Sequence, residues 1–148
     1  MPSNLDLERL LCDARLRYTK EVTPDNSVTY SLPFDTPNGP VQVIVSAGVA
    51  FVAWAFLRCL DDLSIRLRRD FYRDLLIINS SWGFARAFIF MDQHEESEWL
   101  GASSIIPAEG ITPAFAAQAI SDLVELANTA LETLDKATRN PVSPHLAQ

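Results

Sequence analysis

The most apolar stretch of the chain runs from Gly39 to Arg58, and its middle carries no charged side chain. From Val41 to Ser46 a valine stands at every second position, which is typical of a β-strand with one buried face. From Val49 to Leu57 both alternating faces are apolar, as in a strand that is covered on two sides. The pair Ala47-Gly48 separates the two segments. The pattern therefore predicts a hairpin whose second strand needs a cover on each face.

Three further segments have the pattern of strands bounded by turn residues. The first is Val28–Phe34; because Pro33 cannot donate a ladder hydrogen bond, this strand is expected to be an edge strand or to end there. The polar segment from Lys20 to Ser27, which precedes this strand, is interpreted as a turn. The three predicted strands are Val28–Phe34, Phe84–Met91 and Ser97–Ile106, the last two joined by the polar turn Asp92–Glu95.

Helical spacing of apolar residues predicts three helices, over Leu5–Arg17, Ile65–Ser80 and from a Thr112 cap to Thr138. The order of elements is then α-β-β-β-α-β-β-α. This order predicts an α+β fold, with an antiparallel five-stranded sheet and three helices. The chain is expected to form a single domain over residues 1–139, followed by a polar and mobile C-terminal tail at 140–148.

The amino-acid composition and the net charge narrow the class of protein. Of the 148 residues 48% are hydrophobic and 21% are charged, which is typical of a globular domain. A net charge of −7 disfavours direct binding to nucleic acid, which needs a cationic surface. Cys12 and Cys59 are expected to be reduced thiols, and no signal peptide is evident, so a cytoplasmic location is the default expectation. A membrane helix over Val41–Leu57 is the alternative to the hairpin, but the run is short and interrupted by polar residues.

The search for reactive groups finds no enzyme signature. His94 begins the sequence HEESE, which lacks the second histidine of a metalloprotease motif. Glu95, Glu96 and Glu98 lack the spacing of a calcium loop. We therefore expect no catalytic residue, no cofactor and no metal ion, and we expect that the protein is not an enzyme.

Several motifs of modest specificity follow one another between about Phe71 and Leu134: Leu75–Asn79, Trp82, Phe84–Phe88, Asp92 and Ile106–Thr112. Their order and spacing, together with the order of the predicted elements, resemble the YbjN-like family, the bacterial sensory transduction regulators. The fold of that family is similar to that of class I type III secretion chaperones. The resemblance implies a small bacterial homodimer without cofactor that binds other proteins or regulates stress and secretion-like processes.

The favoured hypothesis is a dimeric, chaperone-like or adaptor-like module that acts on another bacterial protein. Its second apolar face would either join the dimer interface or receive an extended segment of the partner protein. Its candidate interface residues are Ile44, Val52, Trp54 and Phe56, because Val52, Trp54 and Phe56 lie on the second apolar face of their strand, with Ile44 nearby.

Two other hypotheses stay open. One is a small-molecule sensor or enzyme with a pocket between the last helix and the sheet, near Asn79, Arg86 or His94. The other is direct nucleic-acid binding through the arginines between Arg66 and Arg73.

Overall fold

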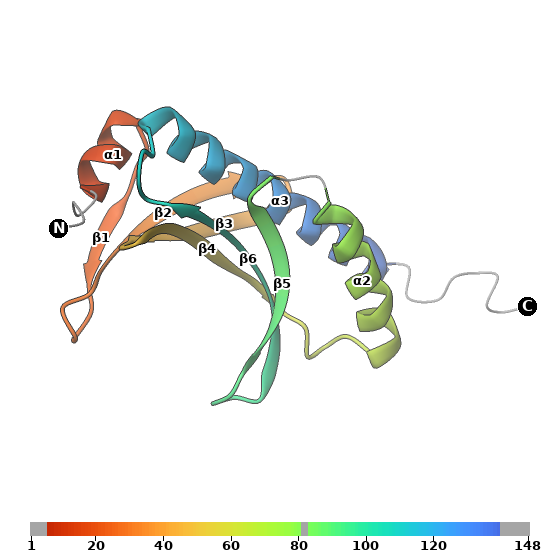
Figure 1. Ribbon diagram of the computed structural model, residues 1–148. Helices are drawn as coiled ribbons and strands as arrows, with labels where there is room; N and C mark the ends of the chain where they lie inside the picture. The colour runs from red at the N-terminus through yellow and green to blue at the C-terminus, as the bar shows by residue number, and fades with distance from the viewer. Residues whose placement is uncertain (1–5, 81–82, 140–148) are drawn as a thin grey trace, which may run out of the picture.

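The computed structural model describes residues 6–80 and 83–139, and Figure 1 shows how their helices and strands are arranged. Trp82 and the expected tail at 140–148 lie outside the described residues. The elements are α1 (Leu7–Asp13), β1 (Thr19–Val22), β2 (Val28–Thr36), β3 (Gly39–Ala47), β4 (Ala50–Cys59), α2 (Ile65–Ile78), β5 (Ala85–Asp92), β6 (Ser97–Pro107) and α3 (Pro113–Arg139).

The strands form one sheet in the order β1-β2-β3-β4-β6-β5, with every pair antiparallel. The α+β class, the three helices and the antiparallel sheet are confirmed. The stretch that could have been a membrane helix forms β3 and β4, whose register pairs Ile44 with Trp54. The predicted number of five strands is wrong, because the sheet has six.

The missed strand is β1, which the sequence placed largely in a turn. All four of its residues are exposed, so they carry no apolar alternation from which a strand could be predicted. Its hairpin with β2 closes through local polar contacts: the Asp25 carboxylate accepts hydrogen bonds from the Thr23 hydroxyl and from the Ser27 N–H, which lower the pKa of Asp25. Asn26 has a φ of 66°, a backbone region that asparagine tolerates.

Pro33 lies inside β2 rather than at its end. The pairing of β1 with β2 stops at Ser31, so Pro33 lies past the end of β1 and pairs only with Gln42 of β3. At this position β2 is an edge, and the missing N–H of the proline leaves no ladder hydrogen bond unmade.

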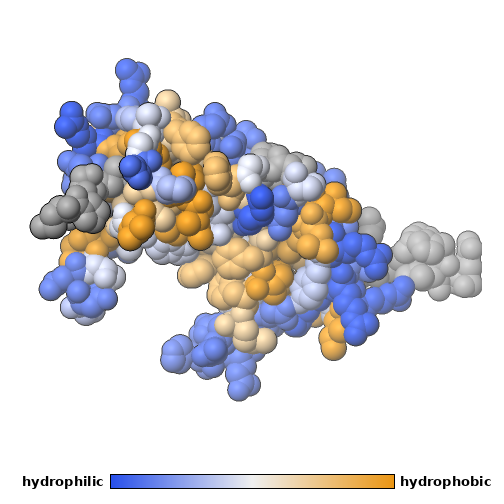
Figure 2. All heavy atoms as spheres, viewed as in Figure 1, coloured by the Kyte–Doolittle hydropathy of each residue, from blue (hydrophilic) through white to orange (hydrophobic). Residues whose placement is uncertain are grey.

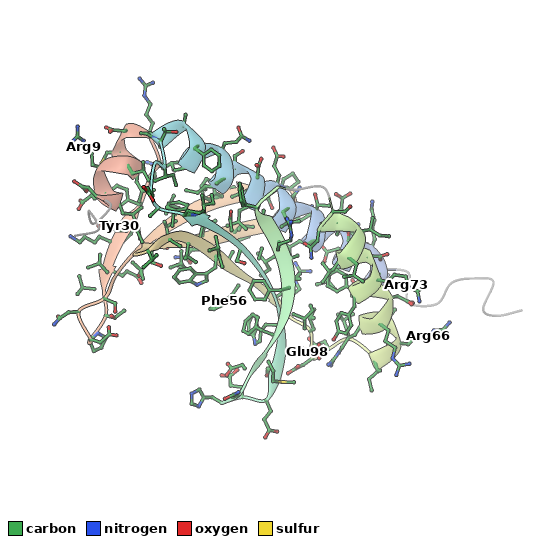
Figure 3. All side chains as sticks on the ribbon, in the orientation of Figure 1. Arg9, Tyr30, Phe56, Arg66, Arg73 and Glu98 are labelled. Carbon is green, nitrogen blue, oxygen red and sulfur yellow. The ribbon has the colours of Figure 1, made fainter. Side chains whose placement is uncertain are left out.

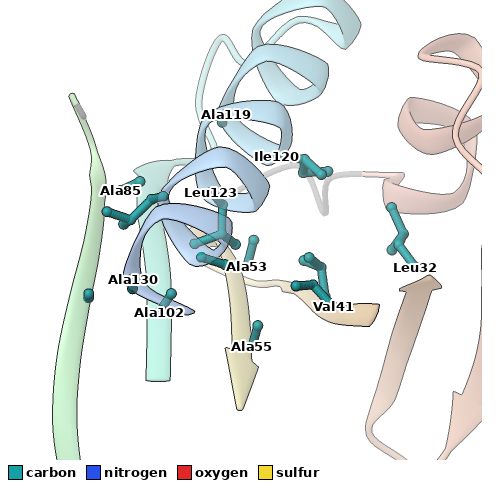
Figure 4. Packing of buried hydrophobic residues seen from close by; sticks show 14 of the residues in the cluster. Leu32, Val41, Ala53, Ala55, Ala85, Ala102, Ala119, Ile120, Leu123 and Ala130 are labelled. Atoms are coloured by element: carbon teal, nitrogen blue, oxygen red, sulfur yellow. The ribbon is translucent and has the colours of Figure 1, made fainter. Parts of the chain in front are cut away.

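All three helices lie on one face of the sheet, which arches beneath α3 (Figure 1). Helix α3 contacts β2 to β6, while α1 and α2 flank it. Figure 4 shows the core between this helix and the sheet, where small side chains of the central strands let the helix approach closely. The core includes Leu32, Val41, Ala53, Ala55, Ala102, Ile120, Leu123 and Ala130.

Helix α1 is shorter than predicted. The Asp6 carboxylate caps it by accepting from the N–H of Arg9. Arg15 adopts a φ of 58°, and the helix ends at Asp13, four residues before the predicted end at Arg17. Tyr18 then folds back, and its hydroxyl contacts the Cys12 thiol and donates to Glu8; these two hydrogen bonds raise the pKa of Tyr18.

Candidate protein-binding surface

The sheet has one face turned away from the helices, and among the described residues no helix covers it (Figure 1). The alternation of buried and less buried residues along β3 and β4 shows which side chains it holds: Val43, Val45 and Ala53 are buried beneath α3, and their neighbours point the other way. We call this side the uncovered face. Its apolar residues are Ile44, Val52, Trp54, Phe56, Phe88, Phe90, Trp99 and Ile105.

The four residues proposed from the sequence all lie on the uncovered face. Ile44 pairs with Trp54 across β3 and β4, and Val52 pairs with Ile105 across β4 and β6. Phe56 is 61% exposed and points away from α3 (Figure 3), whereas Ile44, Val52 and Trp54 are half-buried by their neighbours. The structure thus brings the four together on adjacent strands.

Aromatic residues that the sequence interpretation missed extend this surface across the sheet. Phe88 and Phe90 of β5 follow one another on the uncovered face, with ring centroids 5.7 Å apart. The ring of Phe90 also contacts Phe56, at a centroid distance of 5.1 Å. The signal was the alternation of aromatic residues in β5, which was assigned to a strand but not to a face.

The uncovered face is divided into an apolar and a polar half. Toward β2 and β3 it carries Ser31 and Gln42, whose side chains are hydrogen-bonded to each other. The apolar half lies over β4, β6 and β5 and ends at the acidic tip of the β5–β6 hairpin. Figure 2 shows hydrophilic residues at that tip, beneath a hydrophobic area on the body of the molecule.

The arginines of α2 are divided between structural and exposed positions. Arg68 donates to the Glu98 carboxylate at 2.8 Å, and Tyr72 donates to the other carboxylate oxygen, which joins α2 to β6. Asp61, before α2, accepts from the N–H of Glu98, and this hydrogen bond lowers the pKa of Asp61. Arg66 and Arg73 point outward from α2 (Figure 3), and Arg69 is exposed as well.

Arg58, which begins the same basic stretch, forms an ion pair with Asp135 of α3. It faces α3 because a bulge between Phe56 and Arg58 shifts the register of β4. The basic stretch of the sequence is therefore not one continuous surface.

A cavity of about 150 Å³ lies between the start of α3 and strands β5 and β6. Its most unusual member is Ser104, which is 1% exposed and whose hydroxyl has no hydrogen-bond partner among the described residues. Asn79 and His94, which the sequence suggested for such a pocket, do not line it: Asn79 bonds to Ala87 and His94 lies at the hairpin tip. The cavity is lined by Gly83, Phe84, Ala85, Ser104, Phe115, Gln118, Ala119 and Asp122.

Within the described part of the chain, no three histidine, cysteine, aspartate or glutamate side chains are grouped so that they could hold a metal ion. Over the same residues, no helix is both long and apolar enough to span a membrane.

Comparison with known proteins finds a similar fold. No family model matches the sequence, and no curated protein matches it either. The structure is similar to the crystal structure of YbjN from E. coli, a protein described as a candidate transcription regulator. The TM-score is 0.62, over 90% of each chain, with 15% sequence identity. This chain therefore has a YbjN-like fold, as the sequence resemblance indicated.

Proposed function

We propose that the protein is a non-enzymatic, homodimeric protein-binding module of chaperone or adaptor type, and that the uncovered face is its binding surface. The observation that carries this proposal is the aromatic cluster of Phe56, Phe88 and Phe90 on a sheet face that no described helix covers. Contiguous apolar surfaces of this kind mark protein contact sites, and aromatic residues dominate the energy of such contacts.

The shape of the surface also supports the proposal. Trp54 lies where β4 is paired with both β3 and β6, and Phe56 lies where β4 is paired with β6, so their backbone loses little conformational freedom when a partner binds. The polar half, with the exposed Gln42, supplies the rim that a protein interface has around its apolar centre. The client is a bacterial protein, and the family resemblance extends the proposal to stress response.

The test is the substitution Trp54→Asp, which places a charge at the centre of the uncovered face. We expect a folded protein, by circular dichroism, that loses self-association and partner binding. Val49→Asp is the matched control, because Val49 is apolar and 97% exposed but lies in the turn between β3 and β4. A strict monomer whose folding and partner binding are unchanged by Trp54→Asp would contradict the proposal.

Direct binding to nucleic acid is not part of the proposed function. Among the arginines of α2, only Arg66, Arg69 and Arg73 are exposed, and the chain has a net charge of −7. Phosphate binding would show as a strong dependence of affinity on salt. We expect no shift of duplex DNA in an electrophoretic assay at low salt, and a shift that salt abolishes would contradict this.

The alternative function is a small-molecule sensor or enzyme that uses the cavity beneath α3. The buried Ser104 hydroxyl favours it, because this hydroxyl has no hydrogen-bond partner among the described residues and a ligand could supply one. The cavity volume of about 150 Å³ is small, because ligand pockets usually measure about 300–1,000 Å³. We therefore rank this function second. A small-molecule screen by thermal shift tests it: a ligand that raises the melting temperature of the wild type but not of Ser104→Ala would support it.

A further inference from the structure

The cavity between the start of α3 and strands β5 and β6 has Ser104 at its floor. Ser104 pairs with Ala53 of β4 on one side and with Ala85 of β5 on the other, so its side chain lies on the face of the sheet that α3 covers. Ala119 of α3 lines the cavity as well, and Figure 4 shows these alanines between the helix and the sheet. Side chains this short do not fill the space between the two layers, which leaves the hollow.

The Ser104 hydroxyl is the feature of this cavity that points to a ligand. The residue is 1% exposed, and its hydroxyl has no hydrogen-bond partner among the described residues. Buried hydroxyl groups in proteins almost always have a partner. Because Ser104 lines the cavity, a molecule inside the cavity can supply one. The floor thus fits a ligand that carries a hydrogen-bonding group at its inner end.

The mouth of the cavity is aromatic. Phe84, in the turn before β5, and Phe115, in the first turn of α3, both line it, with ring centroids 6.1 Å apart and ring planes at 63°. The two rings are 56% and 42% exposed. Arg86 holds the turn that carries Phe84, because it donates to the carbonyls of Gly83 and Ala85. A ligand ring can extend this edge-to-face pair, which is the arrangement that aromatic rings prefer.

The charges of the lining favour a neutral ligand. Among the described residues that line the cavity, Asp122 carries the only charge, and its carboxylate accepts from the side-chain amide of Gln118 at 2.8 Å. An anionic ligand would find no counter-charge in this lining. An ammonium group at the floor would lose its water and meet only the Ser104 hydroxyl, which does not compensate for a buried charge.

We propose that the cavity binds a small neutral aromatic molecule with one hydroxyl group, of the size of phenol. Its hydroxyl bonds to Ser104, and its ring extends toward Phe84 and Phe115. A dry cavity of about 150 Å³ holds one benzene ring, and this cavity has that volume. The inference rests on the cavity of the alternative function and names the chemical class of its ligand. It does not involve the uncovered face, which lies on the opposite side of the sheet.

Titration with phenol and with toluene, followed through the amide signals in two-dimensional NMR, tests the proposal. Toluene has the shape of phenol with a methyl group in place of the hydroxyl. We expect both to shift the signals of Ser104, Gln118 and Ala119. Ser104→Ala should weaken the binding of phenol relative to toluene roughly two- to tenfold, the range for one hydrogen bond. Ser103→Ala is the matched control, because Ser103 pairs with Trp54 on the uncovered face, and it should leave the ratio unchanged.

A second variant tests the position of the ligand. Ala119→Leu places a larger side chain in the cavity, on a helix where leucine is well tolerated, and should abolish the shifts from both probes in a folded protein. Shifts that survive in Ala119→Leu, or that fall on Phe56 and Phe90 of the uncovered face instead, would overturn binding in the cavity.

The outcomes separate the ligand class from the alternative function. A ratio of phenol to toluene affinity that is the same in the wild type and in Ser104→Ala would overturn the hydroxyl-bearing class and leave the cavity as a ligand site. A wild type that binds neither probe would overturn this inference, whereas the alternative function falls only if the thermal-shift screen finds no ligand as well.

Discussion

The ring of Phe88 lies across Gly101 of the neighbouring strand, so close that a Cβ atom at position 101 would stand 2.8 Å from Cζ of Phe88. Gly101 is the residue where β6 pairs with Phe56 of β4 on one side and with Phe88 of β5 on the other. The absence of a side chain there lets the phenylalanine ring lie flat on the uncovered face. Gly101 thus shapes the surface that we propose for protein binding.

The substitution Gly101→Ala should lift the Phe88 ring off the sheet. We expect a loss of about 1 kcal/mol in the free energy of unfolding from overpacking, measured by urea denaturation. In a Phe88→Ala background the same substitution should be neutral or stabilising, because glycine inside a strand costs about 0.5–1 kcal/mol relative to alanine. Equal effects of Gly101→Ala in the two backgrounds would show that the two residues are not coupled.

The ion pair between Arg68 and Glu98 should contribute more to stability than the exposed charges of α2. Their side chains are only 21% and 18% exposed, and Arg68 also donates to the carbonyls of Asp61 and Leu63. We expect Arg68→Ala to lower the free energy of unfolding by about 1.5–3 kcal/mol, the range for hydrogen bonds to charged groups. Arg66→Ala, on the same helix but exposed, should change it by less than about 0.5 kcal/mol; equal losses would contradict the role of Arg68.

Several of these relationships could be predicted from the sequence and others could not, for physical reasons. The alternation of Val41, Val43 and Val45 defines a buried face. The two apolar faces of Val49–Leu57 predicted the second apolar surface, with Ile44 nearby. Strand β1 has no such alternation, because all of its residues are exposed and only its partner β2 holds it in the sheet. A strand whose side chains are all exposed shows no periodic pattern, even when its partner follows it directly in the chain.

The same limit applies to the functional surface. Phe88 and Phe90 lie near Phe56 because β6 lies between β4 and β5 in the sheet. No single segment of the sequence indicates this strand order. Ile65, the first residue of α2, has the right spacing for the apolar side of the helix but is 70% exposed, whereas Phe71 and Leu75 are buried. Periodicity indicates which side chains share a face but not which neighbour covers them.

Stability should depend on pH through Asp61. The hydrogen bond from the N–H of Glu98 lowers the pKa of Asp61 below its ordinary value of 3.8. The unfolded chain therefore binds this proton first as the pH falls. The contribution is complete above about pH 5 and is lost as the pH drops below 3.8 toward the folded pKa.

Melting temperatures of the wild type and Asp61→Asn between pH 2 and 7 test this linkage. We expect the wild type to be more stable at pH 7 and the difference to shrink below about pH 4. Asp62→Asn is the control, since Asp62 is exposed and makes no hydrogen bond in the described structure. A difference between wild type and Asp61→Asn that does not change with pH would contradict the assignment.

The most direct test of the central claim, that the uncovered face binds protein, is the mass of the purified chain in solution by light scattering over a range of concentrations. We predict a mass of twice the 16.5 kDa of one chain for the wild type and for Val49→Asp. For Phe56→Asp we predict the mass of one chain in a folded protein. A wild type that stays at 16.5 kDa throughout, or a Phe56→Asp variant that remains dimeric, would contradict the account.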